Sequence, residues 1–382
     1  MREVKFLHCA DLHLDAPFTS LGSDGVKSSI RRNELKQAFQ GIIEAAEREK
    51  VDLLLISGDL YNHDYVKKST INFINDGFHA IAPIKVFIIP GNHDPYVANS
   101  SYRSFQWSEN VYILTEETPC AVFDSMGICV YGAGLGVSRT NGPAFSHLGP
   151  VDPDYINILL FHGTVDMNIG QNAYNPVESK VLSSLGMDYV ALGHFHNRKD
   201  DMGGTGTVYN PGSPDPLGFD EPGEHGFYLG TVTDLGDGKR SKSIRFVRLN
   251  KRFYADLDVY IDGCGTDEQV IQKIQKAAAD AKIGTDDCLS VVLKGYPERE
   301  FKPDIFHVKR HLKDRFFYIK IKDETSPYYN IQEIMKEPGI RGLFARKIFL
   351  RLSQADNDDE KQVLADAFRY GMEALEKGKV DL

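Results

Sequence analysis

The stretch VDLLLISGDLY, residues 51–61, decides the fold of this chain. Its apolar run from Val51 to Ser57 predicts a buried strand, and Gly58 and Asp59 follow this run directly. In an open α/β sheet, the carboxyl ends of the strands line one crevice where ligands bind. A carboxylate at this position therefore indicates a functional group at the edge of such a sheet.

Four other segments repeat this pattern of an apolar run followed by metal-binding side chains. The five runs are Val4 to Cys9, Val51 to Ser57, Ile84 to Ile89, Ile156 to Phe161 and Tyr189 to Leu192. The side chains that follow them are Asp11 and His13, Asp59, Asn92, His162, and the pair His194 and His196. Because strand ends converge at one crevice, we expect these seven residues to form one site.

The composition is that of a soluble globular protein with two or three domains. Of its 382 residues, 42% are hydrophobic and 26% charged, and no apolar run approaches the roughly 20 residues of a membrane span. The N-terminal residues lack the apolar region of a signal peptide, so the default expectation is a cytoplasmic protein without membrane association. A net charge of −10 argues against a general nucleic-acid coat but allows local basic ridges that bind DNA.

Strand and helix signals divide the chain into three regions. Residues 1–250 begin with a βαβ order and continue with further strands, which predicts two packed sheets with helices outside them. The first two helices are expected at about Ser29 to Lys50 and Tyr65 to Ala80. Residues 251–325 have the pattern of a small α+β domain, and residues 326–382 are helical.

The predicted ligands suit a pair of divalent cations. Two cations about 3.5–4 Å apart can neutralise a phosphate, generate hydroxide from water and stabilise a leaving oxygen. Cations so close together need a shared anionic ligand, and Asp59 is the natural bridge. Asp11, His13 and one histidine of the late pair would then hold one ion, and Asn92, His162 and the other histidine the second. Oxygen and imidazole ligands without thiolate favour manganese, with iron or zinc as alternatives.

A histidine and a carboxylate follow Asn92 directly and form the predicted catalytic pair. His93 would lie beside the cations and donate to the phosphate or to the leaving group. Asp94 would fix the tautomer of His93 and raise its pKa. Each motif alone is weak, because Gly-Asp is a common turn, but five strand ends that all carry ligand-type residues are a strong signal.

Five motifs occur in the order that defines the calcineurin-like metallophosphoesterases, and the chain resembles that family. The motifs are Asp11-x-His13, Gly58-Asp59-x-Tyr61, Gly91-Asn92-His93-Asp94, His162-Gly163 and Gly193-His194-x-His196. The resemblance implies a four-layer αββα sandwich, followed here by the small α+β capping domain and the C-terminal helices. It also implies two metal sites, one made by Asp11, His13, Asp59 and His196 and the other by Asp59, Asn92, His162 and His194, with His93 as the catalytic histidine.

Within that superfamily the chain resembles the SbcD-type DNA repair nucleases, and among them the branch named YhaO. The resemblance rests on residues 6–15, on residues 209–214 followed by Phe219-Asp220-Glu221, and on the small domain after the sandwich. It implies a DNA substrate, an SbcC-like SMC-type ATPase partner and a homodimer. One departure is Asn62, because many nuclease members have a histidine three residues after the bridging aspartate.

Two surface features have a structural explanation beside a functional one. The apolar positions of residues 342–352 either dock the ATPase or pack within their own domain. They are Gly342, Leu343, Phe344, Ala345, Ile348, Phe349 and Leu352. The basic clusters within residues 245–252 and 309–315 either follow a DNA backbone or form a solvated face.

Three functional hypotheses follow from the sequence. The first is a manganese-dependent DNA phosphodiesterase, an exonuclease or endonuclease that acts in DNA repair. The second is the same chemistry on a nucleotide, a cyclic dinucleotide or a phosphoprotein. The third is a scaffold that positions an ATPase and has a purely structural metal site.

Overall fold

The computed structural model describes residues 2–21, 25–133, 145, 148, 151–167, 174–298, 301–326, 329–355 and 357–377. The chain forms two compact units. The first unit comprises Met1–Ala255 and Asp286–Cys288, and the second comprises Asp256–Thr285 and Leu289–Leu382. All nine predicted site residues belong to the first unit.

Two six-stranded sheets form the centre of the first unit within the described residues, in the strand orders β12-β11-β1-β2-β3-β4 and β5-β6-β7-β8-β10-β9. The first sheet contains β1 (Arg2–Cys9), β2 (Leu53–Ser57), β3 (Lys85–Ile89), β4 (Val111–Ile113), β11 (Gly226–Gly236) and β12 (Lys239–Arg248). The second contains β5 (Cys120–Phe123), β6 (Ile128–Ala133), β7 (Ile156–His162), β8 (Tyr189–Gly193), β9 (Lys199–Met202) and β10 (Val208–Asn210). β1 to β4 are parallel, as are β6, β7, β8 and β10, so each sheet gathers the carboxyl ends of four strands at one edge.

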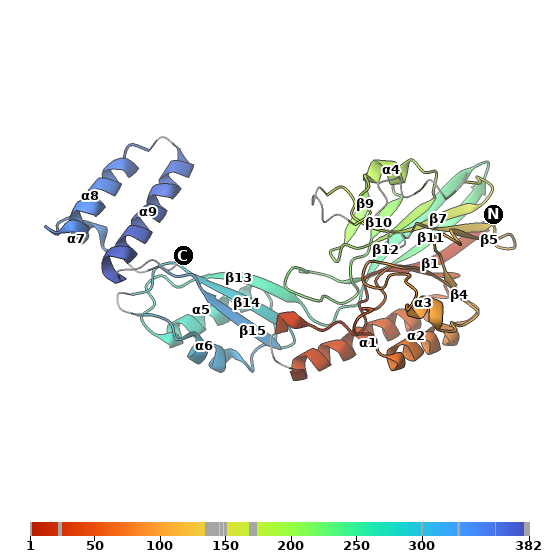
Figure 1. The fold of residues 1–382 in the computed structure, drawn as a ribbon, viewed down its shortest axis with the longest axis horizontal. Coiled ribbons are helices and arrows are strands. Elements are labelled where there is room, and N and C mark those ends of the chain that lie inside the picture. The colour runs from red at the N-terminus through yellow and green to blue at the C-terminus, as the bar shows by residue number, and fades with distance from the viewer. Residues whose placement is uncertain are drawn as a thin grey trace. The chain divides into compact units, whose positions relative to one another are not determined.

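The two sheets pack face to face because alternate residues of each strand point to the same side. Leu53 and Leu55 of β2 share one buried core with Ile158 and Leu160 of β7. Helices α1 (Gly25–Glu49) and α2 (Lys68–Ala80) run along the first sheet (Figure 1). On the outer side of the second sheet, α4 (Ser179–Ser183) contributes Leu182 to a separate apolar cluster. The layers are therefore helix, sheet, sheet and helix, which confirms the predicted sandwich.

Helix boundaries differ from the sequence expectation at two places. The first helix begins at Gly25, four residues before the predicted start at Ser29. The second begins at Lys68 rather than at Tyr65. The N–H groups of Tyr65 and Val66 donate instead to the carbonyl oxygen of Asn62, so residues 62–66 form a turn before the helix. The short elements η1 (Thr19–Leu21) and α3 (Ser101–Ser104) complete this unit.

The remaining elements follow the predicted order of an α+β region and then helices. They are β13 (Tyr254–Tyr260), α5 (Asp267–Asp280), β14 (Cys288–Lys294), α6 (Ile305–Leu312), β15 (Tyr318–Asp323), α7 (Ile331–Ile334), α8 (Ile340–Leu352) and α9 (Asp358–Lys377). The three strands form one sheet in the order β13-β14-β15. Among the described residues, no helix combines the length and the apolar character needed to cross a membrane.

The apolar residues of α8 have two different environments. Phe344, Ile348 and Phe349 pack on a small core that α8 shares with α9, so they do not form the exposed face that the sequence allowed. The exposed apolar side chains of α8 are Ile340, Leu343 and Leu350, with 72%, 48% and 61% of their surface accessible. Their spacing places them on one side of the helix.

Gly193, the last residue of β8, allows the two sheets to approach closely at the site. A Cβ atom at this position would lie 2.0 Å from the carbonyl oxygen of Ser57, the last residue of β2. Such a distance cannot be kept, so any larger residue must push the two strand ends apart.

We predict that Gly193→Ala lowers the free energy of unfolding by about 1–3 kcal/mol through this overpacking. Chemical denaturation followed by circular dichroism measures the change. Gly25→Ala is the control, because a Cβ atom there would meet no heavy atom within 4 Å and should change stability by less than about 0.5 kcal/mol. Equal stability of the two variants would contradict the packing argument.

Candidate metal centre

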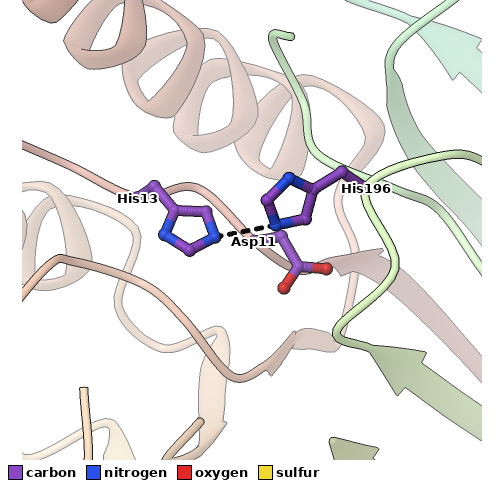
Figure 2. Close-up of side chains that lie close together, drawn as sticks. All are labelled: Asp11, His13 and His196. Atoms are coloured by element: carbon purple, nitrogen blue, oxygen red, sulfur yellow. Dashed lines mark hydrogen bonds between the residues drawn. The ribbon is translucent and has the colours of Figure 1, made fainter. Parts of the chain in front are cut away.

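The predicted ligands lie together at the carboxyl edges of the two sheets. Within the described residues, their donor atoms form three overlapping groups whose members lie within 4.8 Å of one another. The groups are Asp11, His13 and His196; His13, Asp59 and His93; and Asp11, Asp59 and His162. Figure 2 shows Asp11, His13 and His196 gathered around one point. Shared members join the three groups into one cluster.

Asn92 and His194 join this cluster through an amide oxygen. Asn92 Oδ1 lies 3.0 Å from His162 Nε2 and 3.0 Å from His194 Nδ1. The structure therefore brings all seven predicted ligands together, as the sequence predicted from the five strand ends.

Unusual backbone conformations are concentrated in this cluster. Asp11, His13, Asp59 and His194 have φ angles of 54°, 47°, 52° and 100°, a region that residues with a Cβ atom rarely adopt. Hydrogen bonds between loops hold these conformations. The N–H of Asp11 donates to Gly58 O at 3.1 Å, and the N–H of His13 donates to Asp59 O at 2.9 Å. Strain of this kind persists only where the surrounding structure over-determines it, and it is typical of functional sites.

Three histidines are oriented by hydrogen bonds from their Nδ1 atoms to oxygen acceptors. These bonds join His13 to Asn62 Oδ1 at 2.7 Å, His162 to Ser57 O at 2.8 Å, and His196 to Glu221 Oε1 at 2.6 Å. An acceptor oxygen requires the proton on Nδ1, so in the neutral imidazole the Nε2 lone pair faces the cluster. His13 Nε2 and His196 Nε2 lie 3.0 Å apart, as Figure 2 shows. When both rings are neutral, their Nε2 lone pairs point at one place that a cation can occupy, so the donor set suits the predicted metal.

Asp59 occupies the position expected of a bridge between two cations. Its Oδ2 lies 3.6 Å from His13 Nε2 and 3.3 Å from His162 Nε2. Its Oδ1 accepts the N–H of His93 at 2.7 Å. The carboxylate is almost fully buried and faces one histidine of each predicted metal site.

The charges of the buried carboxylates control the pKa values of the histidines. Burial alone would lower the pKa of His162, but the charge of Asp59 and its hydrogen bond raise it to about 9. Burial also opposes protonation of His196, yet the Glu221 carboxylate raises its pKa to about 9. Burial dominates at His13 and lowers its pKa to about 4. The Asp59 carboxylate therefore stabilises the protonated ring of His162, and the Glu221 carboxylate stabilises that of His196.

Two residues orient ligands in ways that the sequence did not reveal. In the sequence, Glu221 stands out only as part of a family motif, yet it is buried and its Oε2 also accepts bonds from Ser213 Oγ and Leu217 N. Asn62, a departure from the nuclease pattern, holds the His13 ring. The Phe219-Asp220-Glu221 motif was the available signal for Glu221, but only the fold places it beside His196.

Asp94 does not orient His93 as predicted. Its carboxylate accepts the backbone N–H groups of Asp59, Leu60 and Gly91 and the hydroxyl of Tyr102. The His93 ring is not among its partners within the described residues. Asp94 is fully buried, and its two oxygens bind three backbone N–H groups. It therefore fixes the loops that present Asp59.

The two basic clusters differ in the structure. Within residues 245–252, Arg252 is buried and pairs with Glu34 at 2.6 Å, and Arg245 pairs with Glu49 at 3.2 Å. That cluster is therefore largely neutralised. On and after α6, four cations are exposed and form no ion pair within the described residues. They are Lys309, Arg310, Lys313 and Arg315.

Comparison with known proteins identifies relatives of this chain. The sequence profile of the calcineurin-like phosphoesterase family matches residues 4–198. A Bacillus subtilis (strain 168) protein named "uncharacterized metallophosphoesterase YhaO" is 27% identical over 366 residues, which cover 90% of this chain and 87% of that protein.

More distant relatives carry names of DNA repair proteins and nucleases. The "DNA double-strand break repair protein Mre11" of Methanopyrus kandleri is 25% identical over 59% of this chain and 53% of its own length. A component of the nuclease SbcCD from Staphylococcus epidermidis is 26% identical over 51% of this chain and 57% of its own length. The chain thus matches about half the length of each of these two proteins.

We predict that Glu221→Gln lowers the pKa of His196 from about 9 toward the ordinary value of 6.5. The carboxylate stabilises the protonated imidazole, so without it the ring releases its proton at lower pH. NMR titration of the cation-free protein measures this shift. Affinity for Mn²⁺ should fall about 10- to 100-fold in the same variant, by calorimetry, because the neutral amide holds the His196 ring less firmly than the carboxylate does.

Glu224→Gln is the matched control for this prediction. Glu224 lies on the same loop, but it is exposed and its ion pair with Arg198 is 3.9 Å long. It should leave both the pKa of His196 and the Mn²⁺ affinity unchanged. If Glu221→Gln behaves like this control, Glu221 does not orient His196.

Proposed function

Because the chain belongs to the calcineurin-like phosphoesterase family, we propose that it hydrolyses phosphodiester bonds of DNA with two divalent cations, manganese first among them. The observation that carries the proposal is the set of three imidazoles whose Nδ1 atoms are tied to oxygen acceptors. This arrangement leaves their Nε2 atoms free to face buried carboxylates: those of His13 and His162 face Asp59, and His196 lies in one group with Asp11. Such orientation of ligands from behind is typical of functional metal sites.

The proposed ligand sets follow the family motifs and the geometry. Asp11, His13, Asp59 and His196 would hold one cation. The donor atoms of Asp11, His13 and His196 lie within 4.8 Å of one another, which supports this set. Asp59, Asn92, His162 and His194 would hold the other, since Asn92 Oδ1 lies 3.0 Å from both histidines. Asp59 would serve both cations. The mixture of oxygen and nitrogen donors supports manganese, with iron or zinc as alternatives.

When bound, a pair of divalent cations neutralises the phosphate and lowers the pKa of water, which makes attack on phosphorus feasible near neutral pH. His93 would hold the proton for the departing oxygen, because its exposed ring lies 4.8 Å from the His13 ring between centroids. Asp59 Oδ1 binds the N–H of His93 and so fixes the backbone of that residue. Asp94 would act only through the loops that it holds.

Two observations support DNA as the substrate. Relatives named as a DNA repair protein and as a nuclease match about half of this chain. The four exposed cations on and after α6, Lys309 to Arg315, provide the positive charge that phosphate contacts need. The proposal of DNA repair rests on these names and this surface together.

We also propose an SMC-type ATPase partner that docks on α8. Ile340, Leu343 and Leu350 are exposed on one side of this helix. Arg346 donates to two backbone carbonyl groups of residues 335 and 337, so this basic residue holds the segment between α7 and α8. The proposed docking surface is therefore formed by Ile340, Leu343 and Leu350, and not by the phenylalanines in the core that α8 shares with α9.

We predict that Asp59→Ala abolishes Mn²⁺-dependent hydrolysis of labelled duplex DNA, because the shared ligand is lost. His93→Gln should lower kcat by about 10²- to 10⁴-fold while Mn²⁺ binding persists, because only proton transfer is removed. His63→Gln is the control, since within the described residues the neighbouring His63 bonds His93 only through its backbone N–H. DNA cleavage at the normal rate by Asp59→Ala would refute the proposal.

A substrate panel separates DNA from the alternatives. Cyclic nucleotides, a phosphopeptide and duplex DNA are compared by kcat/KM with the same protein and cation. A higher kcat/KM for cyclic nucleotides would indicate a small-molecule substrate, and a higher kcat/KM for the phosphopeptide would indicate a phosphoprotein substrate. Full activity of the partner complex assembled with His93→Gln would instead support the scaffold hypothesis.

For the partner, we predict that Leu343→Asp prevents co-purification of an SMC-type ATPase that the wild-type chain retains. A charged side chain at an apolar interface costs desolvation without a partner charge. Mass spectrometry identifies the retained protein, and Leu235→Asp, at an exposed position on β11, is the control. Retention by Leu343→Asp would exclude this face as the docking surface.

A further inference from the structure

A cavity of about 260 Å³ opens beside the metal centre. Its lining includes three site histidines, His13, His93 and His196. It also includes apolar groups that the proposed hydrolysis does not use, among them Pro17, Phe18 and Leu217. Apolar groups directly beside a phosphodiesterase centre call for their own explanation.

One buried arginine, Arg31, supports the apolar residues Phe18 and Leu217 of the cavity. The guanidinium carbon of Arg31 lies 5.2 Å from the centre of the Phe18 ring. The same guanidinium donates to Asp215 Oδ1 at 2.7 Å and to Pro216 O at 2.8 Å, immediately before Leu217. Arg31 is fully buried, so this charge serves the interior of the protein and not its surface.

A second brace connects the cavity wall to the metal centre. The N–H of Leu217 donates to Glu221 Oε2 at 3.0 Å, and Glu221 Oε1 holds His196 at 2.6 Å. The chain at Phe18 is also fixed in a strained conformation, with a φ of 53°. The chain segments at Phe18 and Leu217 are thus held by buried charges and by a strained backbone. This support indicates that the cavity is a preformed site.

The chemistry of the cavity limits what it can hold. Its volume is below the roughly 300–1,000 Å³ of pockets for drug-sized ligands, so it suits a single ring system. Asp220 lines the same cavity, and within the described residues no donor reaches its carboxylate. This negative charge repels a neighbouring phosphate group. An uncharged planar group with hydrogen-bond donors fits the wall and the carboxylate better.

We propose that this cavity binds the nucleobase of the nucleotide next to the scissile phosphate. The inference rests on the proposed phosphodiesterase function and names a substrate class for the same site. Pro17, Phe18 and Leu217 cover the base, and Asp220 accepts hydrogen bonds from its edge. The base then orients the phosphate against the metal centre, and a substrate without a base loses this contribution.

The test compares two diesters that differ only in the base. They are thymidine 5′-(4-nitrophenyl phosphate) and the same ester of 1,2-dideoxyribose, with release of 4-nitrophenol measured in Mn²⁺. We expect kcat/KM to be about fivefold or more higher for the base-bearing ester. Leu217→Trp, which fills the cavity, should bring this ratio close to one. Leu235→Trp, the same change at an exposed leucine of β11, should leave the ratio at its wild-type value.

A binding measurement provides a readout that is independent of turnover. In saturation-transfer NMR with deoxyadenosine 5′-monophosphate, the base protons should receive more saturation than the sugar protons in the wild-type protein. This difference should vanish in Leu217→Trp and persist in Leu235→Trp. A stronger signal from the sugar protons in the wild type would overturn the proposal.

The kinetic outcomes separate this inference from the proposed function. Equal kcat/KM for the two esters, with both hydrolysed, overturns the nucleobase site and leaves the phosphodiesterase function standing. Hydrolysis of neither ester overturns both. A preference for the base-bearing ester that survives Leu217→Trp also overturns the assignment to this cavity.

Discussion

The buried negative charge of Asp59 is the constraint on which the rest of the centre depends. A carboxylate taken out of water is costly unless charges and hydrogen bonds compensate it. Here His13 and His162 face one oxygen, and the N–H of His93 binds the other. These contacts hold the pKa of Asp59 below its usual range even though burial would raise it. The contacts that compensate the burial of the Asp59 charge also bring histidines from both sheets around it.

The loops around Asp59 are held in conformations that they would not adopt alone. Asp59 itself has a positive φ, and Asp94 fixes it by accepting the N–H groups of Asp59, Leu60 and Gly91. Asp94 is therefore a structural element of the site although it follows the catalytic candidate in sequence. Burial and the nearby charge of Asp59 raise the pKa of Asp94 to about 7.

Glu221 and Arg31 extend this organisation away from Asp59. Glu221 uses one oxygen for His196 and the other for the wall that contains Leu217. Arg31 supports that wall and the Phe18 ring from the interior. Orientation of a ligand and shaping of the adjacent cavity are thus coupled through a few buried charges. Glu221 therefore links the metal centre to the proposed substrate contact.

The sequence determined the sandwich and the convergence of the seven predicted ligands, because strand ends in parallel sheets must converge and Asp59 follows such a strand. The roles of Asp94, Glu221 and Arg252 required the tertiary structure. Adjacency in sequence suggested that Asp94 serves His93, and charge alone suggested that Arg252 is exposed, but side-chain partners depend on loop paths that local pattern does not encode. Glu221 lies 25 residues from His196, and only the packed fold closes that distance to a hydrogen bond.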